Sequence, residues 1–264
     1  MAEPRADDHL AVWVYGVLDG DAPDLPRRAG VDERHDVALI RHAGLAAIAS
    51  AVPLEEFRKE ALQESLEDLE RLAALARAHQ RVLDDALRLG PVVPLRICTI
   101  YESSDSVREM LEHERRSLAD ALRRLSGVAE WGVKAYLGAA GDPPAATAPA
   151  PTPASGIDYL ARKRGERDAA GAARQAAGAT LELIHGRLSE VALDAVLSRP
   201  QDPRLSGEQR DMVLNGAYLV PEGRSAEFRS MVGSLRRRHA PDGLELELTG
   251  PWPAYHFTGS AAAV

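Results

Sequence analysis

The fold class is decided by residues 66–101, which read LEDLERLAALARAHQRVLDDALRLGPVVPLRICTIY. In the first two thirds of this stretch, apolar residues recur every three or four positions with Glu, Asp and Arg between them, as in an amphipathic helix. These positions are Leu66, Leu69, Leu72, Leu75 or Ala76, His79, Leu83 and Leu87. Gly90-Pro91 ends the helical pattern, and the β-branched composition of Pro91–Tyr101 then predicts a strand. This combination indicates a mixed α and β fold.

The segments around this stretch repeat the mixture of strands and helices. The predicted strands are Leu10–Val17, His35–Arg41, Gly44–Val52 and Glu130–Leu137, and a second helix is predicted over about Ser104–Leu125. Strands, helix, strand, helix and strand in this order favour an α+β domain, with a mostly antiparallel sheet and helices packed against it.

A compositional break at residues 138–155 divides the chain. This stretch holds five prolines, many small residues and one charge, so it has too little apolar area to offset the entropy of ordering it. Alternating Ala and Pro favour an extended, semi-stiff spacer. We therefore expect an N-terminal domain over residues 1–137, a Pro/Ala-rich linker over 138–155 and a C-terminal domain over 156–264.

The C-terminal part is also predicted to mix helices with strands. The predicted helices are a long one over about Gly156–Gly186 and a second over Ser225–His239, and the predicted strands are Val191–Ser198, Asp211–Val220 and Leu244–Thr249. The last strand alternates strictly between apolar and polar residues, as half-buried antiparallel strands do. The expected fold class is therefore α+β with two domains, each a mainly antiparallel, ferredoxin-like sheet packed with helices, the second domain including a long helix.

Composition excludes several classes of protein. The chain has 264 residues and a formal net charge of −8, which argues against a nucleic-acid binder that needs a concentrated basic face. Its one cysteine, Cys98, excludes an internal disulfide framework and a cysteine-clustered metal site. Ala43–Leu54, the longest charge-free apolar run, is too short to cross a bilayer, and the acidic Met1–Asp8 does not match a secretory signal peptide. We expect a soluble, cytoplasmic protein.

The sequence gives little indication of catalysis. It lacks the glycine-rich, nucleophile-elbow and paired-histidine motifs of nucleotide-binding proteins, hydrolases and metalloproteases. Glu109 and His113 have the spacing of half a metal site, but Arg115 and Arg116 beside them favour a solvated face with i, i+4 ion pairs. His79 lies on an apolar stripe, as a hydrogen-bonded core histidine does. We expect no catalytic residue, no metal and no cofactor, and an inert buried thiol at Cys98.

Five motifs, in order along the chain, resemble those of the gas vesicle protein GvpL/GvpF family. They are Pro94–Leu111, Glu130–Tyr136, Gly156–Lys163, Asn215–Val220 and Gly250–Phe257, and His79 also matches the family's arrangement. The matches span nearly the whole chain. Two departures occur: the family usually has Pro-x-Arg-Phe-Gly-Thr where this chain has Pro94–Thr99, and Pro-Pro-Tyr where it has Pro253–Tyr255.

The resemblance implies a two-domain α+β accessory protein used to build gas vesicles, the air-filled protein shells that give some prokaryotes buoyancy. Such a protein acts through contacts with the small shell-forming subunit and with other gas vesicle proteins, in the cytoplasm and in association with gas vesicles. The resemblance implies neither catalytic activity nor binding to nucleic acid or membrane. The alternative from another functional class is a ferredoxin-like ligand-binding module or enzyme of unknown substrate.

Six residues are the candidates for contacting a partner. They are Trp252, Pro253, Tyr255 and Phe257 in the aromatic tail, and Arg96 and Glu102 around the strand of the Pro94 motif. Aromatic anchors dominate the energetics of protein interfaces, and the prolines beside Trp252 keep it from continuing the sheet. The alternative for Trp252 is packing against the core of its own domain. Arg96 and Glu102 have the alternative of a structural ion pair.

Overall fold

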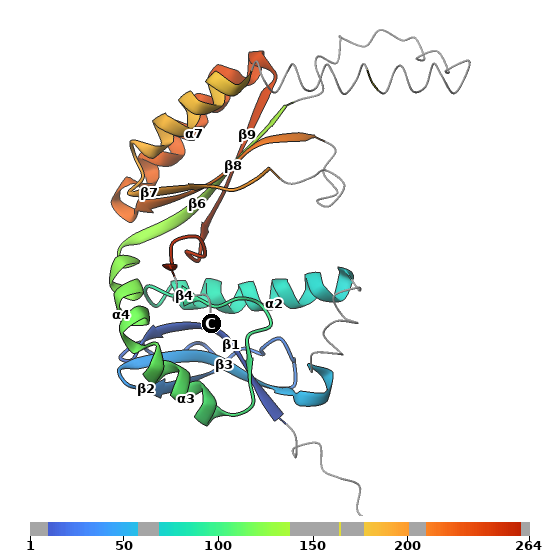
Figure 1. Cartoon of the computed structure of the whole chain (residues 1–264), viewed down its shortest axis with the longest axis vertical. Helices are drawn as coiled ribbons and strands as arrows, with labels where there is room; N and C mark the ends of the chain where they lie inside the picture. Colours follow the sequence, from blue (N-terminus) through green and yellow to red (C-terminus); the bar gives the residue numbers. More distant parts are fainter. Residues whose placement is uncertain (1–9, 58–68, 138–163, 165–176, 201–209, 260–264) are drawn as a thin grey trace, which may run out of the picture. The chain divides into compact units, whose positions relative to one another are not determined.

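The computed structural model describes residues 10–57, 69–137, 164, 177–200 and 210–259, and the chain falls into two units (Figure 1). The first unit combines Met1–Ala129 with Trp252–Val264, and the second is Glu130–Pro251. The polypeptide therefore returns to the first unit after completing the second.

The first unit is built on a five-stranded sheet. Its strands are β1 (Leu10–Asp19), β2 (Ala38–His42), β3 (Leu45–Pro53), β4 (Val93–Pro94) and β5 (Ile100–Tyr101). The order is β2-β3-β1-β4, with β5 also pairing with β1, and every pairing of β1 is antiparallel. The long, apolar β1 is thus the central strand, and both of its edges are occupied.

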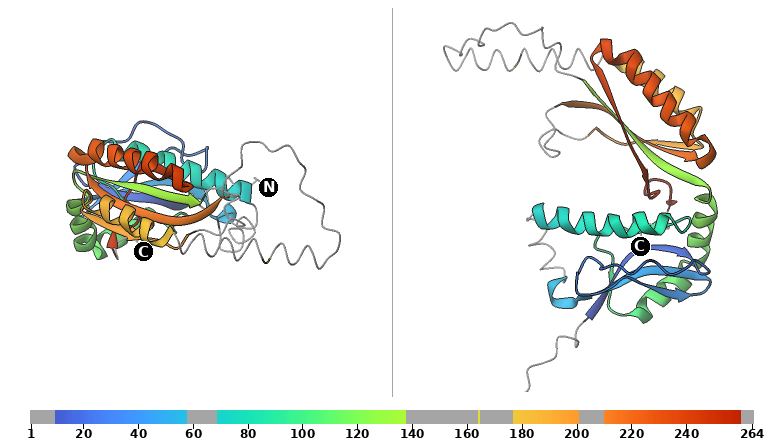
Figure 2. Two further views of the ribbon diagram at one scale, coloured as in Figure 1. Left: turned by 90° about the horizontal axis from the view of Figure 1, so that it is seen from above. Right: turned by 180° about the vertical axis from the view of Figure 1, so that it is seen from behind.

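Helices cover both faces of this sheet. Helix α2 (Leu69–Leu87) lies along one face, and α3 (Ser104–His113) lies on the other, followed by α4 (Arg115–Arg124) (Figures 1 and 2). Side chains alternate between the faces of a strand, so Trp13 and Tyr15 of β1 point together into the core that also contains Val82 and Leu83 of α2. Burial of these residues on the apolar stripe of α2 fixes that helix to the sheet.

Strands β4 and β5 are two halves of one interrupted strand along the edge of β1. Gly16 pairs with Pro94, whereas Trp13 pairs with Ile100, so the register shifts by three residues between the two halves. The amide of Leu95 donates to Tyr15 and that of Val14 donates to Thr99, each at 2.9 Å, which locates the extra residues at 96–98. The continuous strand predicted over residues 91–101 is therefore wrong, because Arg96–Cys98 forms a bulge.

The second unit has a four-stranded sheet with helices on one face. Its strands are β6 (Val128–Leu137), β7 (Asp194–Leu197), β8 (Asp211–Pro221) and β9 (Leu244–Trp252), in the order β7-β8-β6-β9. Phe228 of α7 (Ser225–His239) lies with its ring 6.5 Å from Trp131 and 5.5 Å from Tyr218, centroid to centroid. His185, in the helix of residues 177–189, contacts Tyr218 as well, so both helices cover the same face.

The expected α+β class with two domains is confirmed. The second unit has the ferredoxin-like sequence of elements, with one helix before β7 and one after β8. The first unit has a different order, because three strands precede α2. The observed division also differs from the expected boundary after Leu137, since β6 pairs with strands of the second sheet and the tail belongs to the first unit. The expected linker and most of the helix over 156–186 lie outside the described residues.

Candidate functional site

The aromatic tail begins at Trp252, the last residue of β9, so the expectation that the neighbouring prolines keep Trp252 from continuing the sheet is wrong. The tail combines buried and exposed residues. Ala254, Phe257 and Thr258 are buried, whereas the side chains of Trp252 and Tyr255 are 37% and 36% exposed. Two tight backbone contacts shape the segment: the amide of Tyr255 donates to the Pro253 carbonyl at 2.8 Å, and that of Phe257 donates to Ala254 at 3.2 Å. The tail is therefore a turned segment that presents two aromatic side chains.

An arginine of α4 holds this tail on the first unit. The guanidinium of Arg124, at the end of α4, donates a hydrogen bond to the carbonyl of Phe257, 133 residues away in the sequence. The Gly259 backbone also lies close to the Arg124 side chain. The sequence does not indicate this role for Arg124, because no local pattern shows which carbonyl an arginine will reach.

The structure divides the four tail candidates into two pairs. Pro253 and Phe257 are buried, so their side chains serve to hold the tail in place. Trp252 and Tyr255 are accessible to a partner. Packing of Trp252 against its own domain, the alternative interpretation, is therefore incomplete, since more than a third of the side chain is exposed.

Arg96 lies in the bulge between β4 and β5, and its side chain is exposed. The Thr99 hydroxyl donates to the Arg96 carbonyl at 2.7 Å, which closes the bulge. Cys98 adopts the left-handed backbone conformation with φ 66°, at the position where the family motif has glycine. Residues 96–101 line an open depression of about 440 Å³. A bulge of this kind redirects the side chains it carries: Arg96 is exposed, whereas Ile97 and Cys98 pack against the core of the first unit.

Glu102 is exposed immediately before the first turn of α3. The side chains of Arg96 and Glu102 do not form an ion pair with each other within the described parts of the chain. The structural ion pair that the sequence left open is therefore absent there. Both charged groups are exposed to solvent on the first unit. Burial raises the pKa of the nearby Cys98 thiol, which keeps it protonated at neutral pH.

His79 is a core histidine, as the sequence predicts. The indole Nε1–H of Trp13 donates to His79 Nδ1 at 3.1 Å, so the neutral ring carries its proton on Nε2. Burial lowers the pKa of His79 to about 4, an effect opposed by the backbone of Leu95. The imidazole ring also lies 5.2 Å from the Tyr15 ring, centroid to centroid. A neutral acceptor in this position stabilises the core and has no access to a substrate.

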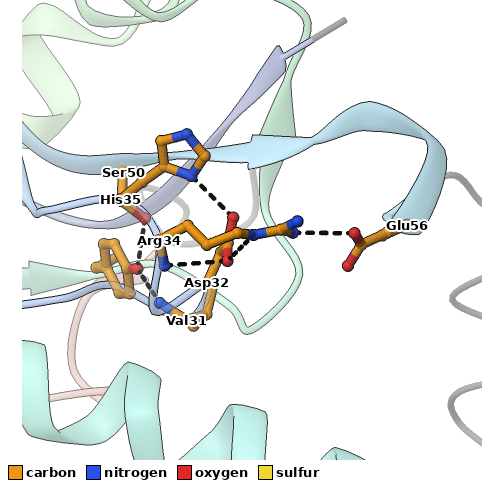
Figure 3. A network of polar contacts seen from close by, with 7 residues as sticks. Val31, Asp32, Arg34, His35, Ser50 and Glu56 are labelled. Atoms are coloured by element: carbon orange, nitrogen blue, oxygen red, sulfur yellow. Dashed lines mark hydrogen bonds and ion pairs between the residues drawn. The ribbon is translucent and has the colours of Figure 1, made fainter. Parts of the chain in front are cut away.

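A polar network near this core orders the loop between β1 and β2 (Figure 3). The Tyr15 hydroxyl accepts from the Val31 amide at 2.8 Å and shares a hydrogen bond of 2.7 Å with Ser50. Burial alone would raise the pKa of Asp32, but hydrogen bonds from Arg34 and His35 outweigh it and lower this pKa.

The Asp32 network is an internal one. Arg34 Nε and His35 Nδ1 each lie 2.8 Å from a carboxylate oxygen of Asp32, and Arg34 also reaches Glu56 at 2.9 Å. The carboxylate of Asp32 is therefore engaged by Arg34 and His35 of its own loop, and its role is structural. Within the described ranges, no cluster of three His, Cys, Asp or Glu side chains is placed to hold a metal ion.

The helices that the structure describes include none with the length and apolar character needed to span a membrane.

Comparison with known families gives a match over nearly the whole chain. The model of the family described as "Gas vesicle synthesis protein GvpL/GvpF" matches residues 11–259. A curated relative, "Gas vesicle protein L" of Streptomyces sp. (strain CB03234), is 40% identical over 254 residues, covering 94% of this chain and 93% of the relative. "Gas vesicle protein F" of the same organism is 27% identical over 260 residues, covering 94% of this chain and 99% of that relative.

Solved structures share the fold. The crystal structure of the gas vesicle protein GvpF from Anabaena sp. PCC7120 superposes with a TM-score of 0.65 at 17% identity, covering 94% of this chain and 96% of that chain. GvpF from Microcystis aeruginosa superposes with a TM-score of 0.63, also at 17% identity, covering 94% and 98% of the two chains. The architecture is thus preserved at low sequence identity.

Proposed function

The chain belongs to the GvpL/GvpF family of gas vesicle proteins, and from this premise we propose that it takes part in gas vesicle assembly by contacting the small shell-forming subunit and other gas vesicle proteins. In this proposal the protein is not an enzyme, it works in the cytoplasm in association with gas vesicles, and it needs no cofactor. The family membership supports the gas vesicle role, and the tail supports a role in binding.

The tail is the observation that carries the proposal. A gas-facing shell needs subunits with exposed apolar surface, and such a surface aggregates unless something covers it. Trp252 and Tyr255 offer two large aromatic groups at the surface, and aromatic residues are enriched among the residues that dominate binding energy. Because Phe257 is buried and its carbonyl is held by Arg124, the tail loses little further freedom when a partner binds.

Co-purification from cells that make the complete set of gas vesicle proteins tests the proposal. A tagged chain is expected to retain the shell-forming subunit. The double variant Trp252→Ala, Tyr255→Ala is expected to retain about tenfold less of this subunit than the wild type does. The matched control is Leu183→Ala, which removes a large apolar side chain that is more exposed than either aromatic residue, from the second unit. Full retention of the shell subunit by the double variant, with its circular dichroism unchanged, contradicts the proposed role of the tail.

Deletion of the gene tests the wider function. Cells without the protein are expected to lack normal gas vesicles, and expression of the intact chain is expected to restore them. Electron microscopy and flotation measure both results. Vesicles of normal number and size in the deletion strain contradict a role in assembly.

A further inference from the structure

The junction of α3 and α4 carries a cationic surface that the aromatic tail does not use. The helix predicted over residues 104–125 is interrupted at Glu114, where φ is −90° and ψ is 8°, so that α3 ends at His113 and α4 begins at Arg115. This interruption changes the charge pairing that the sequence leads one to expect.

On an uninterrupted helix, Glu112 would lie one turn before Arg116 and the two would form a favourable i, i+4 pair. In the structure the Glu112 carboxylate lies instead 3.2 Å from Nε2 of His42, a residue of β2. Asp120, the next acid on the exposed face, forms an ion pair with Arg123. Both acids are therefore committed to other partners.

Arg115 and Arg116 remain as the uncompensated charges of this surface. Both are exposed, and neither takes part in a hydrogen bond or ion pair of its side chain within the residues that the structure describes. The first turn of α4, in which they lie, contains no acidic side chain. They border an open depression of about 570 Å³, whose lining also includes Ala119, His113, the carboxylate of Glu112 that faces His42, and the Asp120–Arg123 ion pair. Three arginines and two acids give this lining a net positive charge.

We infer that the depression at the α3–α4 junction, with Arg115 and Arg116 at its edge, binds an acidic segment of a partner protein. Two neighbouring guanidinium groups without a counter-charge match two carboxylates, since arginine binds carboxylates through paired hydrogen bonds. The small side chain of Ala119 leaves room for a helix or loop to approach. The chain as a whole carries a net charge of −8, so attraction of acidic groups is confined to surfaces of this kind.

This inference rests on the proposed function only in taking the partner to be another protein. Nucleic acid is the less favoured partner, because tight binding to it requires many phosphate contacts along an extended basic face. Free phosphate, as an alternative ligand of the two arginines, is distinguished from an acidic protein segment by whether it releases a bound acidic peptide. The surface is separate in sequence from Trp252 and Tyr255, so the two contacts are removed by different substitutions.

The test measures binding of a fluorescein-labelled helical peptide, with two glutamates spaced four residues apart, to the full chain by fluorescence anisotropy. The wild type is expected to bind this peptide more tightly than a peptide with glutamine in place of glutamate, and added salt is expected to weaken the difference. The variant Arg115→Gln, Arg116→Gln is expected to bind about tenfold more weakly, from two lost surface ion pairs.

The matched control is the variant Arg77→Gln, Arg81→Gln, which removes two exposed arginines from α2 and is expected to bind the peptide as the wild type does. Equal binding by all three proteins, or the absence of binding to the wild type, overturns the inference. Release of the peptide by millimolar inorganic phosphate also overturns it, because the surface is then a general anion site. Loss of peptide binding leaves shell-subunit retention through Trp252 unaffected, so the two proposals fail separately.

Discussion

Replacement of His79 by glutamine is expected to remove most of the pH dependence of stability of the first unit in mildly acidic solution. The buried ring accepts a hydrogen bond from Trp13, and burial lowers its pKa from the ordinary value of 6.5 to about 4. Between these two values the unfolded chain takes up a proton that the folded chain does not. The stabilisation is therefore complete above pH 6.5 and is lost as the pH falls towards 4.

The two pKa values set the size of the effect. Proton linkage gives a loss of about 2 kcal/mol in the free energy of unfolding of the wild type between about pH 7.5 and about pH 5. Glutamine has no titrating group and offers a carbonyl oxygen that can accept from Trp13 Nε1. Its variant is expected to lose about 2 kcal/mol less than the wild type over the same interval, whatever its stability at neutral pH.

Urea unfolding followed by tryptophan fluorescence measures this difference. A background with Trp131→Phe and Trp252→Phe leaves Trp13 as the single tryptophan, so the signal comes from the first unit. Trp131 Nε1 has no hydrogen-bond partner within the described residues, so its replacement breaks no such bond there. The control His113→Gln changes an exposed histidine and is expected to keep the wild-type pH dependence. Equal pH dependence in the wild type and in His79→Gln refutes the assignment to the buried ring.

Three further predictions concern the backbone, and urea unfolding of the same kind measures each. Ala43 has φ 53° in a two-residue hairpin turn before a glycine, so Ala43→Asn is expected to stabilise by about 1 kcal/mol, because asparagine tolerates this conformation; a lower stability contradicts the turn assignment. At Cys98, φ is 66°, so Cys98→Val is expected to cost about 2 kcal/mol while Cys98→Gly costs little, and equal losses argue against the bulge geometry. A Cβ on Gly30 would lie 2.3 Å from Ser50 Oγ, so Gly30→Ala is expected to cost about 2 kcal/mol, whereas Gly186→Ala, in open space, is expected to be neutral or stabilising.

The elements with a clear apolar period are the ones that the sequence predicts. The stripe of leucines over residues 66–89 corresponds to α2, and the predicted pair over 35–41 and 44–52 corresponds to β2 and β3. Helix α7 and strand β8 also follow their predicted ranges, whereas β9 runs on to Trp252, past its predicted end at Thr249. In α7 and in the first part of β9 one face of the element is buried, so the period of burial is written into the local sequence. Strand β3 is instead buried on both faces from Leu45 to Ser50, and its continuous run of small and apolar residues is the signal.

The assignment of β6 shows what local pattern does not contain. Alternation over residues 130–137 indicates a strand correctly, but it does not say which sheet receives it. The partners of this strand are β8 and β9, which follow it by more than 70 residues. A domain boundary placed at the compositional break therefore puts β6 with the wrong set of strands. Such a boundary is decided by the pairing of strands that are distant in sequence, and composition carries no information about that pairing.

Two local irregularities also escaped the pattern. The β-branched residues of the Pro94 motif predict an unbroken strand, yet Arg96–Cys98 forms a bulge. The glycine that the family motif has at the position of Cys98 was a usable signal, because glycine adopts positive φ at low cost. The interruption at Glu114 has no comparable signal in the sequence. It is seen only in the structure, in the backbone of Glu114 with φ −90° and ψ 8°.

Contacts between distant segments, which local sequence does not report, also decide the roles of the residues in the aromatic tail. Composition identifies Trp252, Tyr255 and Phe257 as a cluster, but their roles separate only when the tail returns to the first unit and Arg124 binds the Phe257 carbonyl. Burial of Phe257 holds the backbone and leaves Trp252 and Tyr255 accessible. Ordering a free tail on binding would cost about 1–2 kcal/mol for each residue fixed, and a tail already held in place avoids most of that cost. In the proposed binding role, the buried Phe257 therefore acts indirectly, by fixing the backbone that positions Trp252 and Tyr255.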